Sequence, residues 1–294
     1  MNSLIGNRFN NVTFTECDGS IYGRVTGNGV ESMYRLSDVR FEPKAEAVLM
    51  DLDGTTLDSE PFWVYMIELT IKQLMDKPSF EFENADIPFV SGYTTMEHLR
   101  YCIDKYCPDK DINRANQIYH ETAAFELNEI MQGRGNANAF VPKEGLLDLL
   151  KFFKSENIKI GLVTSGLDYK SIPEIVSVFK QIGLGDPLDY YDAIITGGKR
   201  KGCGDYGSIG EIAAKPHPWL YTELAYAGLK IKDPKRTIVL EDSSAGVMAG
   251  RFAGFPVIGL NTGNITESGL DCLCQYKVNN LTSVKNIICK GEKQ

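Results

Sequence analysis

The stretch AVLMDLDGTTLDSE, residues 47–60, decides how the rest of the chain is interpreted. Its apolar run, residues 47–50, is typical of a buried strand and ends in two aspartates, Asp51 and Asp53, one residue apart. Two carboxylates this close repel and raise each other's pKa unless a cation lies between them. The pattern therefore predicts a functional site at the end of that strand.

The composition is that of a globular protein with a sizeable core. The chain has 294 residues, of which 43% are hydrophobic and 24% charged, and a prior of about 150 residues per domain favours two domains. The net charge of −8 at pH 7 argues against a broad surface for nucleic acids or anionic membranes. No secretory signal is visible, and no apolar segment approaches the ~20 residues that span a bilayer. We therefore predict a cytoplasmic protein without nucleic-acid or membrane partners.

Seven cysteines are scattered along the chain without paired C-x-x-C spacings, so reduced thiols are expected. The only close pair is Cys272 and Cys274, and no further ligand cluster accompanies it.

Residues 1–44 differ from the rest of the chain. The short segments NNVTFTE, SIYGRVTG and ESMYRLSD favour strands and are separated by turn signals at Asp18-Gly19 and Gly27-Asn28-Gly29. They predict a small β-rich extension, which either packs on the core or forms an oligomer contact.

From residue 46 onwards, strand patterns alternate with helix patterns, which predicts a parallel sheet covered on both faces. The fold class is thus α/β, with a doubly wound, Rossmann-like sheet. The expected strands are residues 47–50, 158–163, 193–196, 237–240, 256–260 and, more weakly, 276–278.

The segment between Asp58 and Pro142 interrupts this alternation with helical patterns at 61–77, 94–106 and 111–131. Ser59 is the expected N-cap of the first helix, with Pro61 in its first turn. We predict an inserted helical cap, which would lie over the carboxyl end of the first strand, where open α/β sheets bind ligands. The expected domains are the extension 1–44, a core of 45–59 and 141–294, and a cap of 60–140.

Polar residues follow four of the expected strands, and the carboxyl ends of parallel strands share one edge of a sheet. These residues are Asp51 and Asp53, then Thr164, Ser165 and Gly166, then Lys215, and finally Glu241 and Asp242. Acids, hydroxyl and amide donors and one cation suit phosphoryl transfer, in which an aspartate can attack phosphorus. Carboxylates are also typical Mg²⁺ ligands.

Four segments at these strand ends resemble the motifs of the haloacid dehalogenase-like (HAD) hydrolase superfamily, in particular its β-phosphoglucomutase-like branch. The segments are DLDGTTLDSE, LVTSG, the Lys215-Pro216 pair and LEDSSAG. They occur in the family's order, and the resemblance covers about residues 45 to 290. Residues 1–44 have no counterpart in it, and the chain from Thr196 to Lys215 is longer than expected for this branch.

The resemblance implies roles for individual residues. Asp51 would be the nucleophile and Asp53 the general acid and base, while Thr164 and Lys215 would hold the transferring phosphoryl group. The substrate would contact Ser165 and Gly166 in the core, and Gly92 and Tyr93 in the cap loop. Mg²⁺ would be held by Asp51, the backbone carbonyl of Asp53 and Asp242, with Glu241 supporting nearby.

The predicted function is a Mg²⁺-dependent phosphatase acting on a small phosphorylated metabolite, such as a sugar or polyol phosphate, through an aspartyl-phosphate. The alternatives are a phosphosugar mutase of the same branch and a non-enzymatic phosphate-binding regulator. Trp63 stands where the mutases carry a histidine, and its indole offers no basic nitrogen, which favours the hydrolase. The protein is expected to be a monomer or a small homo-oligomer.

Two further patterns are interpreted as structural. Residues 202–207, GCGDYG, match a dinucleotide-binding fingerprint, but no strand precedes them directly, so we interpret this loop as a flexible insertion. His98 is a secondary candidate for substrate contact, and we interpret it as a helix-surface histidine.

Overall fold

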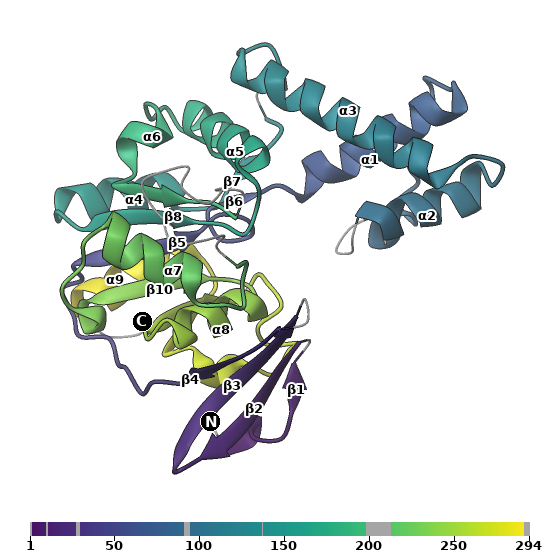
Figure 1. The fold of residues 1–294 in the computed structure, drawn as a ribbon. Coiled ribbons are helices and arrows are strands. Elements are labelled where there is room, and N and C mark those ends of the chain that lie inside the picture. Colours follow the sequence, from purple (N-terminus) through teal and green to yellow (C-terminus); the bar gives the residue numbers. More distant parts are fainter. Residues whose placement is uncertain are drawn as a thin grey trace. The chain divides into compact units, whose positions relative to one another are not determined.

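The computed structural model of the chain describes residues 2–9, 11–27, 30–90, 95–136, 138–197 and 213–290. These residues form two compact units (Figure 1). The first comprises Met1–Leu57, Pro142–Ser171 and Leu184–Gln294, and the second Asp58–Val141 and Ile172–Gly183. The glycine-rich loop 202–207 and the cap-loop residues Gly92 and Tyr93 lie outside the described residues.

A six-stranded parallel sheet forms the centre of the first unit, which confirms the predicted fold class (Figure 1). Its strand order is β12-β11-β10-β5-β8-β9. Every residue of β5 is buried, which explains why this strand has a continuous apolar run rather than an alternating one. The strands are β5 (Ala47–Asp51), β8 (Lys159–Val163), β9 (Ala193–Ile195), β10 (Thr237–Glu241), β11 (Val257–Leu260) and β12 (Tyr276–Val278).

Helices cover this sheet, and two of them show how the sequence specifies the packing. In α4 (Leu146–Ser155) the residues spaced for one helix face are all buried, as predicted: Leu146, Leu149, Leu150 and Phe153. In α8 (Ser244–Phe252) a Cβ on Gly250 would lie only 3.2 Å from side-chain atoms of Val239 and Val257, so glycine permits close helix–sheet packing.

The remaining helical elements are shorter or lie between these. They are α5 (Asp168–Gln181), α6 (Pro187–Tyr190), α7 (Trp219–Glu223), the π-helical turn Leu224–Gly228, α9 (Val284–Lys290), and the 3₁₀ turns Asn2–Leu4, Ile87–Phe89, Pro234–Arg236, Asp271–Leu273 and Leu281–Ser283. None of the helices in the described ranges is both long and apolar enough to span a membrane.

The N-terminal extension is a four-stranded antiparallel sheet, which confirms the predicted β-rich segment. Its strands are β1 (Arg8–Phe9), β2 (Val12–Cys17), β3 (Ser20–Gly27) and β4 (Val30–Arg35). Val12, Phe14 and Val25 are fully buried in the same apolar cluster as Phe252 and Phe255. Of the two roles considered for the extension, the structure thus shows packing on the core.

The second unit contains α1 (Glu60–Met75), α2 (Thr95–Tyr106) and α3 (Ile112–Met131), close to the three expected helices. Pro61 lies in the first turn of α1 as predicted, but Ser59, although at the N-cap position, makes no side-chain capping bond. Two short strands that the sequence did not predict, β6 (Leu57–Asp58) and β7 (Val141–Pro142), form a separate pair. The limits expected for core and cap remain predictions.

The histidine of α2 corrects one interpretation from the sequence. His98 is only 9% exposed, so its interpretation as a helix-surface residue was wrong. The amphipathic pattern of α2 places it with Leu99 and Cys102, which are both fully buried, in the interior of the helical unit.

Candidate active site

Three carboxylates meet at the carboxyl edge of the central sheet. Asp51 ends β5, Glu241 ends β10 and Asp242 follows directly, and β5 and β10 are neighbouring strands. Each residue offers an oxygen, and these oxygens all lie within 4.8 Å of one another. The parallel register thus brings together the acids that the sequence placed at two separate strand ends.

Lys215 lies among these acids. Its Nζ donates hydrogen bonds to Oδ1 of Asp51 and, at 2.6 Å, to Oε1 of Glu241. The side chain is only 6% exposed. Burial lowers the pKa of Lys215, but the carboxylates of Asp51 and Glu241 outweigh this effect and raise the pKa above its ordinary value. Lys215 is therefore a fixed positive charge beside Asp51.

Glu241 is held by hydrogen bonds on both of its oxygens. Oε1 also accepts a bond from the hydroxyl of Tyr221 at 2.6 Å, and Oε2 accepts bonds from Ser243 through both its backbone N–H and its hydroxyl. A Cβ on Gly246 would lie 1.8 Å from Oε1, so the helix start leaves room only for glycine. Tyr221 was missed in the sequence, where its only signal is its place six residues after Lys215.

One lysine does not neutralise three carboxylates, and the pKa values of two of these acids are raised as a result. Burial and then Glu241 raise the pKa of Asp51 well above its ordinary value. Burial and Glu241 likewise raise the pKa of Asp242 to about 7. A cation bound between the acids would relieve this repulsion.

The backbone around Asp242 leaves space beside its carboxylate. A Cβ on Gly54 would lie 2.0 Å from Oδ2 of Asp242, and one on Gly263 would lie 2.5 Å from the same oxygen. With hard oxygen donors, excess negative charge and a glycine-lined cradle, these residues fit a small divalent cation such as Mg²⁺.

The second polar segment lies on the next strand of the sheet. Val163 of β8 pairs with Asp51, so Thr164, which follows it, lies at the same edge. Oγ1 of Thr164 accepts a hydrogen bond from the N–H of Gly166 at 2.9 Å, and Oγ of Ser165 accepts one from the N–H of Lys215 at 3.2 Å. These two bonds shape the loop and tie it to the turn that carries Lys215.

Asp53 differs from the other acids of the site. It lies two residues beyond the end of β5 and is exposed, and a single β-bridge joins it to Leu57. Thr56 in the same turn is fully buried and donates from its hydroxyl to the backbone oxygen of Asp51 at 2.5 Å. The turn thus fixes the backbone at Asp51 while Asp53 stays accessible.

The Gly54 cradle leads to a testable prediction. Gly54 has a φ of +80°, so Gly54→Ala both strains the backbone, by about 1 kcal/mol, and forces its Cβ onto Asp242. If Mg²⁺ binds here, it should raise the thermal midpoint of the unmodified protein, and we expect the substitution to abolish most of that rise. Gly254→Ala is the matched control, because Gly254 has a φ of +87° and no atom within 4 Å of its Cβ position. An equal loss of the Mg²⁺ effect in both variants would contradict the claim that Gly54 leaves room for the cation beside Asp242.

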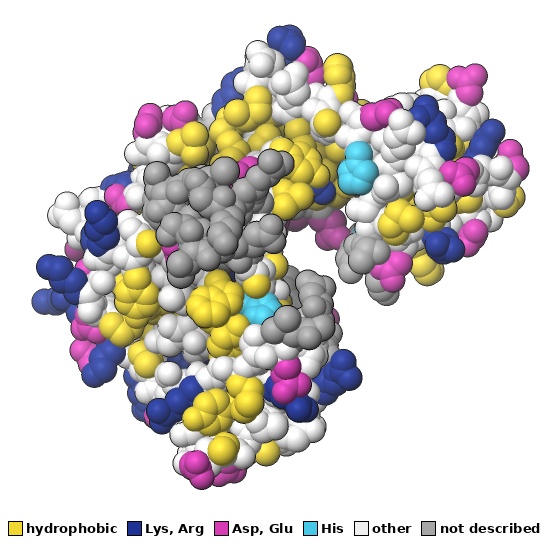
Figure 2. All heavy atoms as spheres, in the orientation of Figure 1, with side chains coloured by type: hydrophobic (Ala, Val, Ile, Leu, Met, Phe, Trp, Pro, Cys, Tyr) yellow, Lys and Arg dark blue, Asp and Glu magenta, His cyan; other side chains and the backbone are white. Residues whose placement is uncertain are grey.

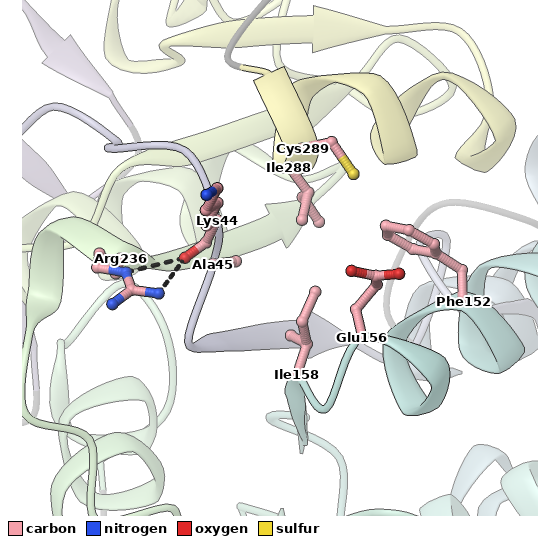
Figure 3. Close-up of a pocket in the computed structure, with 8 residues that line it drawn as sticks. All are labelled: Lys44, Ala45, Phe152, Glu156, Ile158, Arg236, Ile288 and Cys289. Atoms are coloured by element: carbon pink, nitrogen blue, oxygen red, sulfur yellow. Dashed lines mark hydrogen bonds between the residues drawn. The ribbon is translucent and has the colours of Figure 1, made fainter.

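One described cavity lies away from the carboxylate cluster. It has a volume of about 440 Å³, and its lining includes Ala45 and Ile158 (Figure 3). Ala45 lies two residues before β5 and Ile158 one residue before β8, so the cavity opens at the opposite edge of the sheet from the acids. One wall is held by Arg236, whose guanidinium donates two hydrogen bonds to the backbone oxygen of Lys44. This cavity does not serve the carboxylate cluster.

One face of the molecule shows how charged side chains are distributed. On the face drawn in Figure 2, basic side chains are interspersed with acidic ones and gather into no broad basic patch.

Comparison with known proteins shows the family to which the chain belongs. The family model of the haloacid dehalogenase-like hydrolases matches residues 45–254. The chain is 24% identical to a phosphorylated carbohydrates phosphatase of Thermotoga maritima over 71% of this chain and 82% of that protein. It is 25% identical to the validoxylamine A 7′-phosphate phosphatase of Streptomyces hygroscopicus subsp. limoneus, over 76% and 89% respectively. In fold it is similar to a candidate beta-phosphoglucomutase from Thermotoga maritima, with a TM-score of 0.59, 21% identity and coverage of 83% of this chain and 98% of that one.

Proposed function

The chain belongs to the haloacid dehalogenase-like hydrolase family and is a phosphoric monoester hydrolase, and we propose that it releases phosphate from a small sugar or polyol phosphate through an aspartyl-phosphate. The observation that carries this proposal is the buried contact of Asp51 with Lys215 at an edge crowded with acids. The names of the two phosphatase relatives support a phosphorylated carbohydrate as the substrate class.

In the first half-reaction, a carboxylate oxygen of Asp51 attacks the phosphorus of the substrate. A new O–P bond forms, the bond from phosphorus to the ester oxygen breaks, and Asp53 donates a proton to the departing alkoxide. Lys215 offsets the negative charge that the phosphoryl oxygens carry as they approach Asp51. The exposure of Asp53 suits this role, because its carboxyl group has to reach a substrate oxygen.

In the second half-reaction, the carboxylate of Asp53 takes a proton from a water molecule, whose oxygen attacks phosphorus. The P–O bond to Asp51 breaks, inorganic phosphate is released and both aspartates return to their starting states. The hydroxyl of Thr164 and the loop at Ser165 and Gly166 would hold the phosphoryl oxygens during both steps.

The carboxylate cluster also implies a metal cofactor. We propose that Mg²⁺ is held by Asp51, Asp242 and the backbone carbonyl of Asp53, with Glu241 nearby, where it would offset the charge of the acids and of the substrate phosphate. The role of this chain's residues is then to keep the acids close, which Lys215, Tyr221 and Ser243 do through Asp51 and Glu241.

A substrate panel tests this proposal. Phosphorylated sugars and polyols, including β-glucose 1-phosphate with and without glucose 1,6-bisphosphate, are incubated with Mg²⁺ while free phosphate and isomerised sugar phosphate are followed separately. We expect free phosphate from at least one sugar or polyol phosphate, because Trp63 packs edge-to-face on Phe62 at 4.9 Å and supplies no base of the mutase kind. Primer-dependent isomer without free phosphate would instead establish a mutase, and neither product would contradict both.

A further inference from the structure

The turn that carries Lys215 is fixed on one side by the active-site loop. The N–H of His217 donates to the backbone oxygen of Ala214 at 3.1 Å and closes the turn. Within this turn, the N–H of Lys215 donates to Oγ of Ser165 at 3.2 Å. These bonds set the start of the lysine side chain, whose ammonium group has to reach Asp51.

The other side of the same turn contacts the N-terminal sheet. The hydroxyl of Tyr34 in β4 and Nδ1 of His217 are hydrogen-bonded at 2.8 Å. The Tyr34 ring also meets the His217 ring edge-to-face at 5.8 Å and the Trp219 ring at 6.1 Å. One tyrosine of the extension therefore contacts both the lysine turn and the first residue of α7.

Tyr34 is itself held in place by the packing of the sheet. It pairs with Gly23 in β3 and stacks on the ring of Phe252 at 5.7 Å with an interplanar angle of 26°. A Cβ on Gly23 would lie 2.1 Å from Cζ of Phe252, so glycine lets the aromatic ring approach the sheet. Phe252 ends α8, the helix that begins at Ser244, directly after Asp242 and Ser243. The sheet thus links the helix behind the acids to the turn that carries the lysine.

We propose that the N-terminal sheet helps to position the active-site lysine. In this role Tyr34 is a positioning residue, which orients Lys215 through its hydrogen bond to His217. This inference rests on the proposed phosphatase function. It assigns a role to a segment that precedes the matched family region, residues 45–254.

The decisive variant is Tyr34→Phe, which keeps the ring packing and removes the hydroxyl. We expect kcat for the best sugar phosphate to fall about three- to tenfold, the range expected for losing one neutral hydrogen bond, with KM nearly unchanged. Tyr22→Phe is the matched control. It removes a tyrosine hydroxyl from the adjacent strand, where Tyr22 pairs with Arg35 rather than with Tyr34, and within the described ranges this hydroxyl has no hydrogen bond to the lysine turn. This variant should turn over like the unmodified protein.

A second background separates positioning from simple stabilisation. In Lys215→Ala protein, the further change Tyr34→Phe should leave the residual rate unchanged, because the group that Tyr34 orients is gone. A merely structural role would lower the rate by the same factor in both backgrounds, through the fraction of folded protein. All rates are measured well below the lowest unfolding midpoint of the series.

The outcomes are distinct. The proposal is supported if Tyr34→Phe lowers kcat in protein that retains Lys215 but not in Lys215→Ala protein. Unchanged kcat in Tyr34→Phe, or an equal drop in both backgrounds, overturns it. If the unmodified protein releases no phosphate from any substrate of the panel, the proposed function fails. That result comes from the unmodified protein, whereas the positioning role is tested by the Tyr34 variants.

Discussion

Asp51→Asn is expected to lower kcat for phosphate release by about 10³-fold or more, because loss of a covalent nucleophile removes the reaction path itself. The asparagine has nearly the same shape, and its side-chain oxygen can still accept the hydrogen bond from Lys215. The substitution also removes one of three crowded negative charges. The folded state should therefore be retained, and the loss should be seen in kcat rather than in the thermal midpoint.

The control for this result is Asp148→Asn, which removes an exposed carboxylate from α4 and should leave kcat unchanged. Beryllium fluoride, which mimics a phosphoryl group on a carboxylate, should raise the thermal midpoint of the unmodified protein in the presence of Mg²⁺ but not that of Asp51→Asn. More than about a tenth of the original activity in Asp51→Asn would contradict its role as nucleophile.

Asp242→Asn is expected to lower catalytic efficiency in the presence of Mg²⁺ and to raise the thermal midpoint of the metal-free protein. With Mg²⁺, removal of a proposed ligand should lower kcat/KM roughly 10²- to 10⁴-fold. Without metal, the same change relieves repulsion from Asp51 and Glu241, so the thermal midpoint should rise by about 2–4 °C, which corresponds to roughly 1 kcal/mol. The two measurements together separate loss of a ligand from general damage.

The pH dependence of the metal-free protein follows from the same group. Because burial and Glu241 raise the pKa of Asp242 from 3.8 to about 7, the folded protein binds this proton more tightly than the unfolded chain. Its stability should fall as the pH rises through this window, and Mg²⁺ should stabilise it more at about pH 8 than at about pH 5, where protons compete. A Mg²⁺ effect in Asp242→Asn as large as in the unmodified protein would contradict this assignment.

The sequence predicted the sheet and the meeting of the acids for a physical reason. Buried parallel strands leave continuous apolar runs, and in three of the four motifs the polar residues begin where such a run stops, at Asp51, Thr164 and Glu241. Because β8, β5 and β10 are neighbours in the sheet, residues far apart in the chain come to one edge.

Features that depend on tertiary contacts could not be predicted in this way. Tyr221 contacts Glu241 because of the path that the chain takes after the Lys215 turn, and no periodic pattern records this path. Gly263 borders Asp242 from beyond β11, outside every motif. The β6–β7 pair is too short for an alternating pattern, and Ser59 shows that an N-cap position does not guarantee a capping bond.

The packing of the N-terminal sheet has a consequence for biosynthesis. Val12, Phe14 and Val25 are translated long before Phe252, yet they share one apolar cluster with it. Until α8 has emerged from the ribosome, the sheet lacks the ring of Phe252, against which Phe14 and Tyr34 pack. Contacts this distant in sequence form late and favour aggregation of incomplete chains. A nascent chain that stops before Ser244 therefore lacks the surface that its own first strands require.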